Sequence, residues 1–127
     1  DKGHCSYIHG YGRYVRLTFE ASELDERGWV MDFGDLRDIK RWIESEWDHN
    51  VLIAADDPLI PELKKLEETG AIYLNILPDG YYPGIEESCR YLYDMINPMI
   101  QKKTNNRVEI TRVEIWEHEN NHAEYVR

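Results

Sequence analysis

Two short segments carry side chains that could move protons. In the first, Cys5 precedes His9 by four residues, and a thiol becomes a nucleophile or general base only when a nearby histidine, cation or metal lowers its pKa. The second is Asp48-His49, in which a carboxylate can fix the tautomer of the imidazole and raise its basicity. The residues alone leave two alternatives open: Cys5 belongs to an N-terminal tail without a role, and Asp48 belongs to an ordinary loop.

A third candidate is the carboxylate of Glu117, at the end of a predicted strand over 108–117. Val113 and Ile115 lie on one face of that strand, and Glu117 continues the face. An inward carboxylate there could accept two N–H bonds from the guanidine-like edge of a ring. The alternative is a strand that ends at Trp116 and leaves Glu117 in solvent.

The elements that must position these side chains follow from apolar periodicity. An apolar stripe at helical spacing includes Cys89, which predicts a structural thiol inside a long helix, with Pro98 either kinking or ending it. In the strand predicted over 108–117, Val108 and Ile110 stand at even positions, whereas Val113 and Ile115 stand at odd positions. This change predicts a bulge near Thr111-Arg112. We predict strands over 13–20 and 29–33, paired as a hairpin, and over 71–75, 108–117 and 122–126. We predict helices over 35–47, capped by Asp35, from Asp57 to Gly70, and over 85–103.

This order of elements predicts an α+β fold, an antiparallel sheet with helices on one face, in a single domain over 1–127. The exposed edges and face of such a sheet favour burial in a homo-oligomer. The net charge of −10 argues against a general nucleic-acid partner, and no apolar run is long enough for a membrane span. Two cysteines in unlike settings favour reduced thiols and a cytoplasmic protein.

Several of these segments, in this order, match one family. They are Cys5-x-x-x-His9-Gly10, the stretch Gly-Trp-Val-Met-Asp-Phe-Gly-Asp-Leu at 28–36, Trp-Asp-His-Asn-Val-Leu at 47–52, Pro-Gly-Ile-Glu-Glu at 83–87, Trp-Glu at 116–117 and Ala-Glu-Tyr at 123–125. Together they resemble 6-pyruvoyl and 6-carboxytetrahydropterin synthases. The resemblance covers nearly the whole chain, and its most specific motif is 28–36.

The resemblance implies the tunnelling fold, in which sheets close into a barrel by oligomerisation, commonly as a hexamer of two trimers. It also implies zinc and a lyase that converts 7,8-dihydroneopterin triphosphate to 6-carboxytetrahydropterin or 6-pyruvoyl tetrahydropterin, the former on the route to queuosine. In that scheme Cys5 is the proton-abstracting base, Asp48 and His49 complete the relay, and zinc polarises the side-chain oxygens. The substrate residues would be Glu117, which anchors the pterin ring, with Gly84 and Glu86.

The sequence departs from the family at the metal. Of the three histidines that hold zinc there, only His9 is present; Tyr11 stands at a second ligand position, and the first strand with the third ligand is missing from this chain. Gly84 and Glu87 replace a threonine and an asparagine of the substrate pocket, and the added carboxylate is expected to repel phosphate. The alternative functions are a repurposed pterin- or purine-binding homologue without the zinc site, and a structural assembly subunit.

Overall fold

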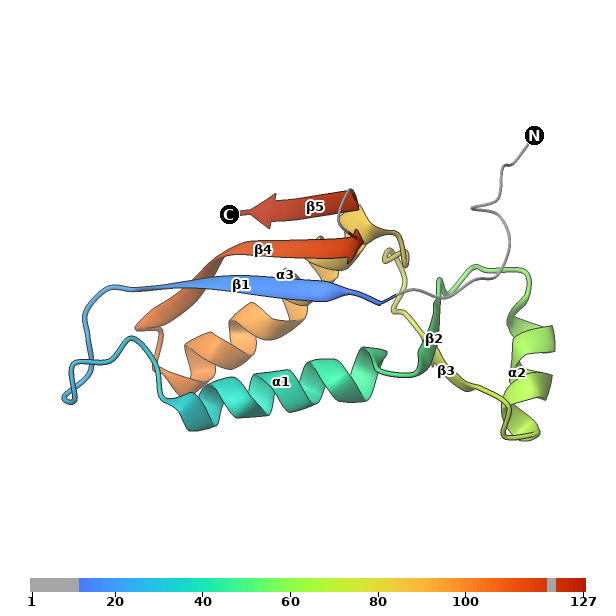
Figure 1. The fold of residues 1–127 in the computed structure, drawn as a ribbon, viewed down its shortest axis with the longest axis horizontal. Helices are drawn as coiled ribbons and strands as arrows, with labels where there is room; N and C mark the ends of the chain where they lie inside the picture. The colour runs from blue at the N-terminus through green and yellow to red at the C-terminus, as the bar shows by residue number, and fades with distance from the viewer. Residues whose placement is uncertain (1–11, 119–120) are drawn as a thin grey trace.

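The computed structural model describes residues 12–118 and 121–127. A three-stranded antiparallel sheet, ordered β1-β4-β5, is covered on one face by two helices, and a two-stranded parallel sheet lies at the other end of the molecule (Figure 1). Among the described residues, no helix is both long and apolar enough to cross a membrane. The elements are β1 (Tyr14–Ala21), α1 (Phe33–Trp47), β2 (Asn50–Ile53), α2 (Ile60–Glu68), β3 (Tyr73–Ile76), α3 (Ile85–Lys103), β4 (Val108–His118) and β5 (Asn121–Val126).

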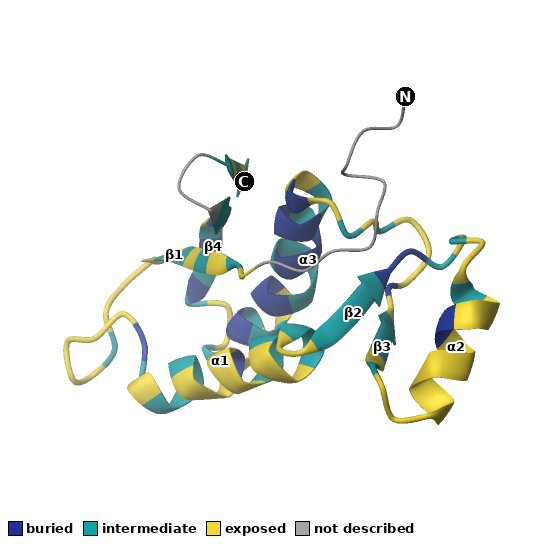
Figure 2. Cartoon of the chain, turned by 45° about the vertical axis from the view of Figure 1, so that its right-hand side comes forward, coloured by how far each residue is buried: buried dark blue, intermediate teal, exposed yellow. Residues whose placement is uncertain are grey.

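The core lies between α3 and β4, and the dark stripe along α3 marks it (Figure 2). The predicted stripe of α3 is confirmed, because each of its members is buried: Ile85, Cys89, Leu92, Ile96 and Ile100. Facing them, Val108, Ile110, Val113 and Ile115 of β4 are fully buried. Side chains from α1 complete this core along its flank. The predicted antiparallel sheet with helices on one face is therefore confirmed.

The alternation predicted for β1 is also confirmed, with Val15, Leu17 and Phe19 packed against the core. The bulge predicted in β4 is present as well. Thr18 pairs with Arg112 and the next residue of β1 pairs with Ile110, so Thr111 is the extra residue. Because of this extra residue, the apolar side chains of β4 face the core both before and after Thr111.

The predicted hairpin between 13–20 and 29–33 is wrong, because β1 pairs with β4 and residues 29–32 form no strand. Local polar contacts divert the chain. The carboxylate of Asp25 accepts the backbone N–H groups of Arg27 and Trp29, and the second of these belongs to the predicted strand. The N-cap prediction is also wrong: Asp32 accepts the Gly34 N–H at 2.7 Å, so α1 begins before Asp35.

The remaining differences concern short elements. The helix predicted from Asp57 begins at Ile60, with Pro61 in its first turn, as expected. Strand 71–75 is shifted to Tyr73–Ile76, and its parallel partner β2 was not predicted. α3 continues through Pro98 to Lys103, so the early end offered as one alternative does not occur.

Candidate functional site

Glu117 lies near the end of β4 with only 15% of its side chain exposed. The pairing of β4 with β5 slips by one residue here, and Glu117 is the extra residue of a second bulge. Its Oε2 accepts the Asn121 Nδ2–H at 2.7 Å, and its Oε1 lies 3.7 Å from Nη2 of Arg13. The alternative of a strand ending at Trp116 with a solvated Glu117 is therefore wrong.

Arg13 precedes β1 and brings four segments of chain together around its guanidinium. Nη1 donates to Ser88 Oγ at 2.7 Å, and Nη2 donates to the Pro83 carbonyl at 2.6 Å. The guanidinium carbon lies 4.9 Å from the ring centroid of Trp47, the last residue of α1. We call this group of five residues, Arg13, Trp47, Pro83, Ser88 and Glu117, the Glu117 site. It lies where α1 ends, α3 begins and β4 approaches β5 (Figure 1).

The sequence predicted only Glu117 among these five residues, although two of the other four, Arg13 and Ser88, had a signal. Arg13 has the same parity as Val15 and Leu17, which places a cation on the inward face of the strand. Ser88 lies three residues after Ile85, on the buried stripe of α3, and is itself buried. A polar side chain on an apolar face normally has a hydrogen-bonding partner, and here the partners are Arg13 and the Pro83 carbonyl.

Asp48 and His49 form the tight junction between α1 and β2. Asp48 is the C-cap of α1, and His49 has a left-handed backbone with φ of 56°, which is uncommon for a residue other than glycine. His49 Nε2 lies 3.7 Å from Asp48 Oδ1, with 94% of the imidazole side chain exposed. The two residues directly follow Trp47, so they start beside the Glu117 site while their side chains face solvent.

Gly84 and Glu86 lie at the start of α3, next to the Glu117 site. Gly84 is the N-cap of α3, and both residues are exposed. The carboxylate of Glu87, expected to repel phosphate, is paired instead with Arg90 Nε at 2.7 Å. This ion pair offsets much of the charge that Glu87 adds to the pocket.

The predicted residues Cys5, His9 and Tyr11 lie outside the described residues. The other cysteine, Cys89, is fully buried, as its place on the stripe of α3 predicted. Burial raises the pKa of its thiol from 9.0 to about 11, although the positive charge of Arg13 acts in the opposite direction. Cys89 is thus a protonated core residue at neutral pH.

We therefore expect Cys89 to resist thiol reagents in the folded protein. A pKa higher by about two units lowers the thiolate fraction near neutral pH about 100-fold, and burial slows the reaction further. The check is the rate of labelling of the Cys5→Ala variant by a chromogenic disulfide, with and without denaturant. Rapid labelling without denaturant would contradict the buried position.

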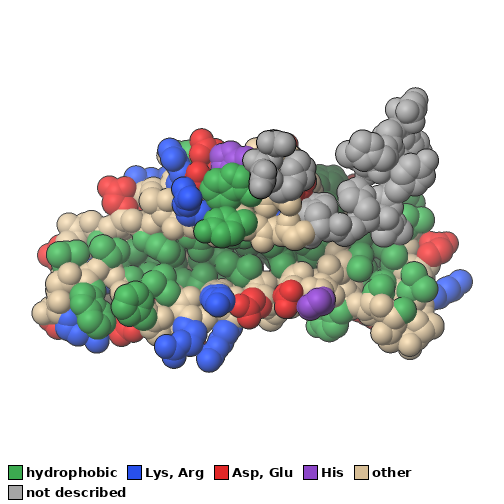
Figure 3. Space-filling view, in the orientation of Figure 1, with side chains coloured by type: hydrophobic (Ala, Val, Ile, Leu, Met, Phe, Trp, Pro, Cys, Tyr) green, Lys and Arg blue, Asp and Glu red, His purple; other side chains and the backbone are tan. Residues whose placement is uncertain are grey.

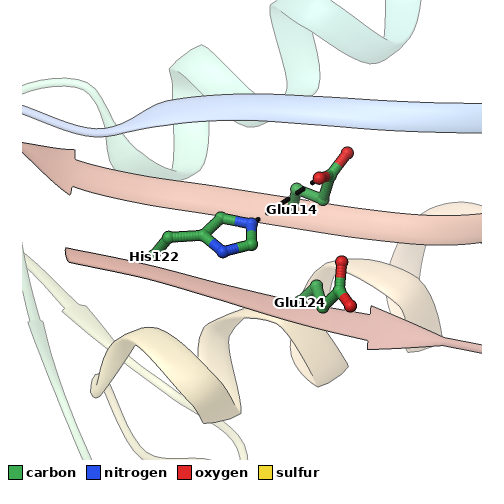
Figure 4. A group of neighbouring side chains, drawn as sticks. All are labelled: Glu114, His122 and Glu124. Atoms are coloured by element: carbon green, nitrogen blue, oxygen red, sulfur yellow. Dashed lines mark ion pairs between the residues drawn. The ribbon is translucent and has the colours of Figure 1, made fainter. Parts of the chain in front are cut away.

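One group of side chains among the described residues has the geometry of a metal site. Glu114 of β4 and His122 and Glu124 of β5 place one ligand atom each within 4.8 Å of the others (Figure 4). These donor types suit zinc. Two cations already compensate the carboxylates, however: Arg16 lies 3.7 Å from Glu114, and Arg112 lies 3.7 Å from Glu124.

This Glu-His-Glu group also lies on the wrong face of the sheet to serve the Glu117 site. His122 and Glu124 alternate with Ala123 and Tyr125, which pack against the core, and so they project from the opposite face. Glu114 likewise alternates with Val113 and Ile115. We assign no chemical step at the Glu117 site to this group.

Comparison with known proteins gives one consistent family. The model of the family described as 6-pyruvoyl tetrahydropterin synthase matches residues 1–127. The chain is 29% identical to the 6-carboxy-5,6,7,8-tetrahydropterin synthase of Aquifex aeolicus over 95% of its own length and 75% of the relative. It is 35% identical to the enzyme of the same name from Rickettsia typhi, over 44% of this chain and 41% of the relative.

Solved structures agree on the fold. An uncharacterized protein of Wolinella succinogenes superposes with a TM-score of 0.77 at 24% identity, covering 97% of this chain and 81% of that one. The 6-pyruvoyltetrahydropterin synthase of Plasmodium vivax gives a TM-score of 0.66 at 16% identity, covering 95% and 82%. The chain therefore belongs to the 6-pyruvoyl tetrahydropterin synthase family, and its prediction as an enzyme of the lyase class is confirmed at the level of that family.

Proposed function

We propose that this protein is a lyase that converts 7,8-dihydroneopterin triphosphate to 6-carboxytetrahydropterin, with release of acetaldehyde and triphosphate. The observation that carries the proposal is the carboxylate of Glu117, largely buried at the end of β4. A buried carboxylate is a strong acceptor for two parallel N–H donors, and the 2-amino and N3–H groups of a pterin form such an edge. The names of the curated relatives support the same product.

The described part of the Glu117 site supplies binding and orientation. Trp47 offers an aromatic ring, and the Pro83 carbonyl and Ser88 hydroxyl hold Arg13 beside Glu117. In the proposal Cys5 removes a proton from the side chain of the substrate, and Asp48 and His49 pass protons to solvent. The exposure of His49 suits exchange with water, and the Asp48 carboxylate lies 3.7 Å from its Nε2.

Zinc belongs to the proposal through the family rather than through the described residues. When bound, it would polarise the side-chain oxygens of the substrate and acidify the adjacent C–H. Of this chain, His9 would hold it, with Tyr11 at the usual position of a second ligand. The Glu-His-Glu group on the far face is a separate set of donors.

Zinc content should therefore fall in His9→Ala and remain unchanged in His122→Ala, as metal analysis of the purified variants would measure.

Incubation with 7,8-dihydroneopterin triphosphate and zinc, with the product identified by mass, tests the proposal. We expect 6-carboxytetrahydropterin from the unaltered protein and a rate about 10²–10⁴-fold lower from Cys5→Ala, because general base catalysis contributes about that much. Cys89→Ala is the matched control and should keep its activity, since that thiol lies in the core. Full activity in Cys5→Ala would remove Cys5 from the mechanism.

A second candidate function is a pterin- or purine-binding protein that has lost catalysis. The observation that favours it is the tyrosine at position 11, where the resemblance places a histidine ligand. This protein would bind pterin through Glu117 and release no triphosphate, even with stoichiometric zinc present. The same incubation, read for triphosphate release, separates the two functions.

We also propose that the sheet closes into a barrel by assembly with further copies of the chain, as a hexamer of two trimers. In the described sheet β1 and β5 are the outer strands, and their backbones can pair with another subunit. Exposed apolar side chains, Trp29, Val30 and Phe33, gather where α1 begins, at the left of Figure 3. The molar mass in solution, by light scattering, tests this assembly.

A further inference from the structure

We propose that Arg13 limits affinity at the Glu117 site, because its guanidinium lies beside the carboxylate that a pterin edge would use and must move when the ligand binds. The inference rests on the proposed function, in which Glu117 accepts the pterin. It makes Arg13 an internal competitor of the ligand.

The guanidinium of Arg13 resembles one edge of a pterin ring in its chemistry. The guanidinium of arginine and the 2-amino, N3–H edge of a pterin are both planar, and both present parallel N–H donors that fit a carboxylate. Both also stack on aromatic rings. Arg13 lies over the ring of Trp47 and forms an ion pair with Glu117, so it faces the same two partners that the pterin would use. The Glu117 site thus already holds a planar group with parallel N–H donors, like the edge of the proposed ligand.

The distances indicate which contact a ligand can take over. Arg13 is held by short bonds to the Ser88 hydroxyl and the Pro83 carbonyl, at 2.7 and 2.6 Å, whereas Glu117 lies at 3.7 Å, beyond hydrogen-bond distance. Glu117 is therefore paired with Arg13 by charge, whereas its Oε2 accepts a hydrogen bond from Asn121 Nδ2 at 2.7 Å. A pterin edge would donate to Oε1 and to the second lone pair of Oε2, and Arg13 makes neither of these short bonds.

Burial makes this competition matter. The side chains of Arg13 and Glu117 are only 10% and 15% exposed, so little of the carboxylate is open to a ligand while the guanidinium lies beside it. The apparent dissociation constant then equals the intrinsic constant divided by the fraction of molecules in which Arg13 has moved away. Removing the guanidinium should remove that factor.

The test is the affinity of Arg13→Ala for unsubstituted pterin, by fluorescence or calorimetry in mildly alkaline buffer. We expect binding at least about tenfold tighter than that of the unaltered protein, as expected when the open form is a minor population. Arg37→Ala is the control, because Arg37 is exposed on α1 and its loss changes the net charge equally. Its affinity should stay unchanged.

A second measurement asks whether a free guanidinium ion can replace the missing side chain. In Arg13→Ala, low concentrations of guanidinium chloride should compete with pterin and restore weak binding, whereas sodium chloride at equal ionic strength should not. If Arg13→Ala does not fold, Arg13→Lys keeps the charge without the planar fork, and it should bind pterin more tightly than the unaltered protein.

The outcomes separate this inference from the proposed function. If the unaltered protein binds pterin and neither Arg13 variant binds it more tightly, the inference is overturned and the proposed function stands. If no variant binds pterin, the proposed function fails and the inference fails with it. If guanidinium and sodium chloride act alike on Arg13→Ala, mimicry by the guanidinium is excluded.

Discussion

Glu117→Gln is expected to weaken pterin binding about 30- to 1000-fold and to reduce product formation accordingly. The amide offers one acceptor oxygen and turns two donor hydrogens toward the ligand, so one bond of the bidentate pair is replaced by a clash of donors. Charge-assisted hydrogen bonds in a largely buried site contribute about 1.5–3 kcal/mol each, and an unpaired donor adds a further penalty. Because Glu117 is only 15% exposed, its hydrogen bonds to a ligand belong to this largely buried class.

Glu114→Gln is the matched control for this prediction. Glu114 lies on the same strand, its side chain is 10% exposed, and it also faces an arginine, yet it projects from the opposite face of the sheet. We expect pterin affinity to be retained in Glu114→Gln, with affinity measured by titration and folding by circular dichroism. Equal losses in both variants would mean that the carboxylates act on folding alone. Unchanged affinity in Glu117→Gln would remove the assigned anchor.

The parts of the fold that sequence predicted correctly are those fixed by local periodicity. The stripe of α3 repeats at helical spacing over five buried residues, more than any other element of the described residues contributes to the core. The bulge at Thr111 was predictable for the same reason, because a change of parity within one strand needs an extra residue if both halves face the core.

Pairing between distant segments could not be predicted in this way. Residues 29–32 have a strand-like composition, but Asp25 accepts the Trp29 N–H in a turn, and Asp32 accepts the Gly34 N–H and starts α1. The partner of β1 is β4, roughly a hundred residues away along the chain, and periodicity carries no information on such a partner. β2 and β3 are four residues each, too short for alternation to be distinctive.

The candidate site shows the same division. Glu117 was found because it continues an apolar face, whereas its contact with Arg13 joins residues that are far apart in sequence. The alternation of β1 places Arg13 on the same face as its core residues. Only the folded chain, however, brings Trp47, Pro83 and Ser88 to its guanidinium. A resemblance to a family cannot supply such a contact, since it transfers only positions that match the family pattern.

Leu92→Ala is expected to lower the free energy of unfolding by about 3–5 kcal/mol, as large-to-small substitutions at fully buried leucines do. Leu92 has no exposed surface and lies in the middle of the α3 stripe, against β4. The removed atoms leave a cavity that neighbours on a helix and a sheet cannot fill without moving backbone. Urea unfolding followed by tryptophan fluorescence, at fixed protein concentration, measures the change.

Leu66→Ala is the control, because Leu66 on α2 is 46% exposed and should change stability by less than about 1 kcal/mol. Similar losses in the two variants would contradict the packing of α3 on the sheet. Leu92 and Ser88 lie one turn apart on α3, so the core residue fixes the helix that carries Ser88 to Arg13. Where Leu92→Ala remains folded, its pterin affinity should match that of the unaltered protein, because the core positions the Glu117 site without contributing a group to it.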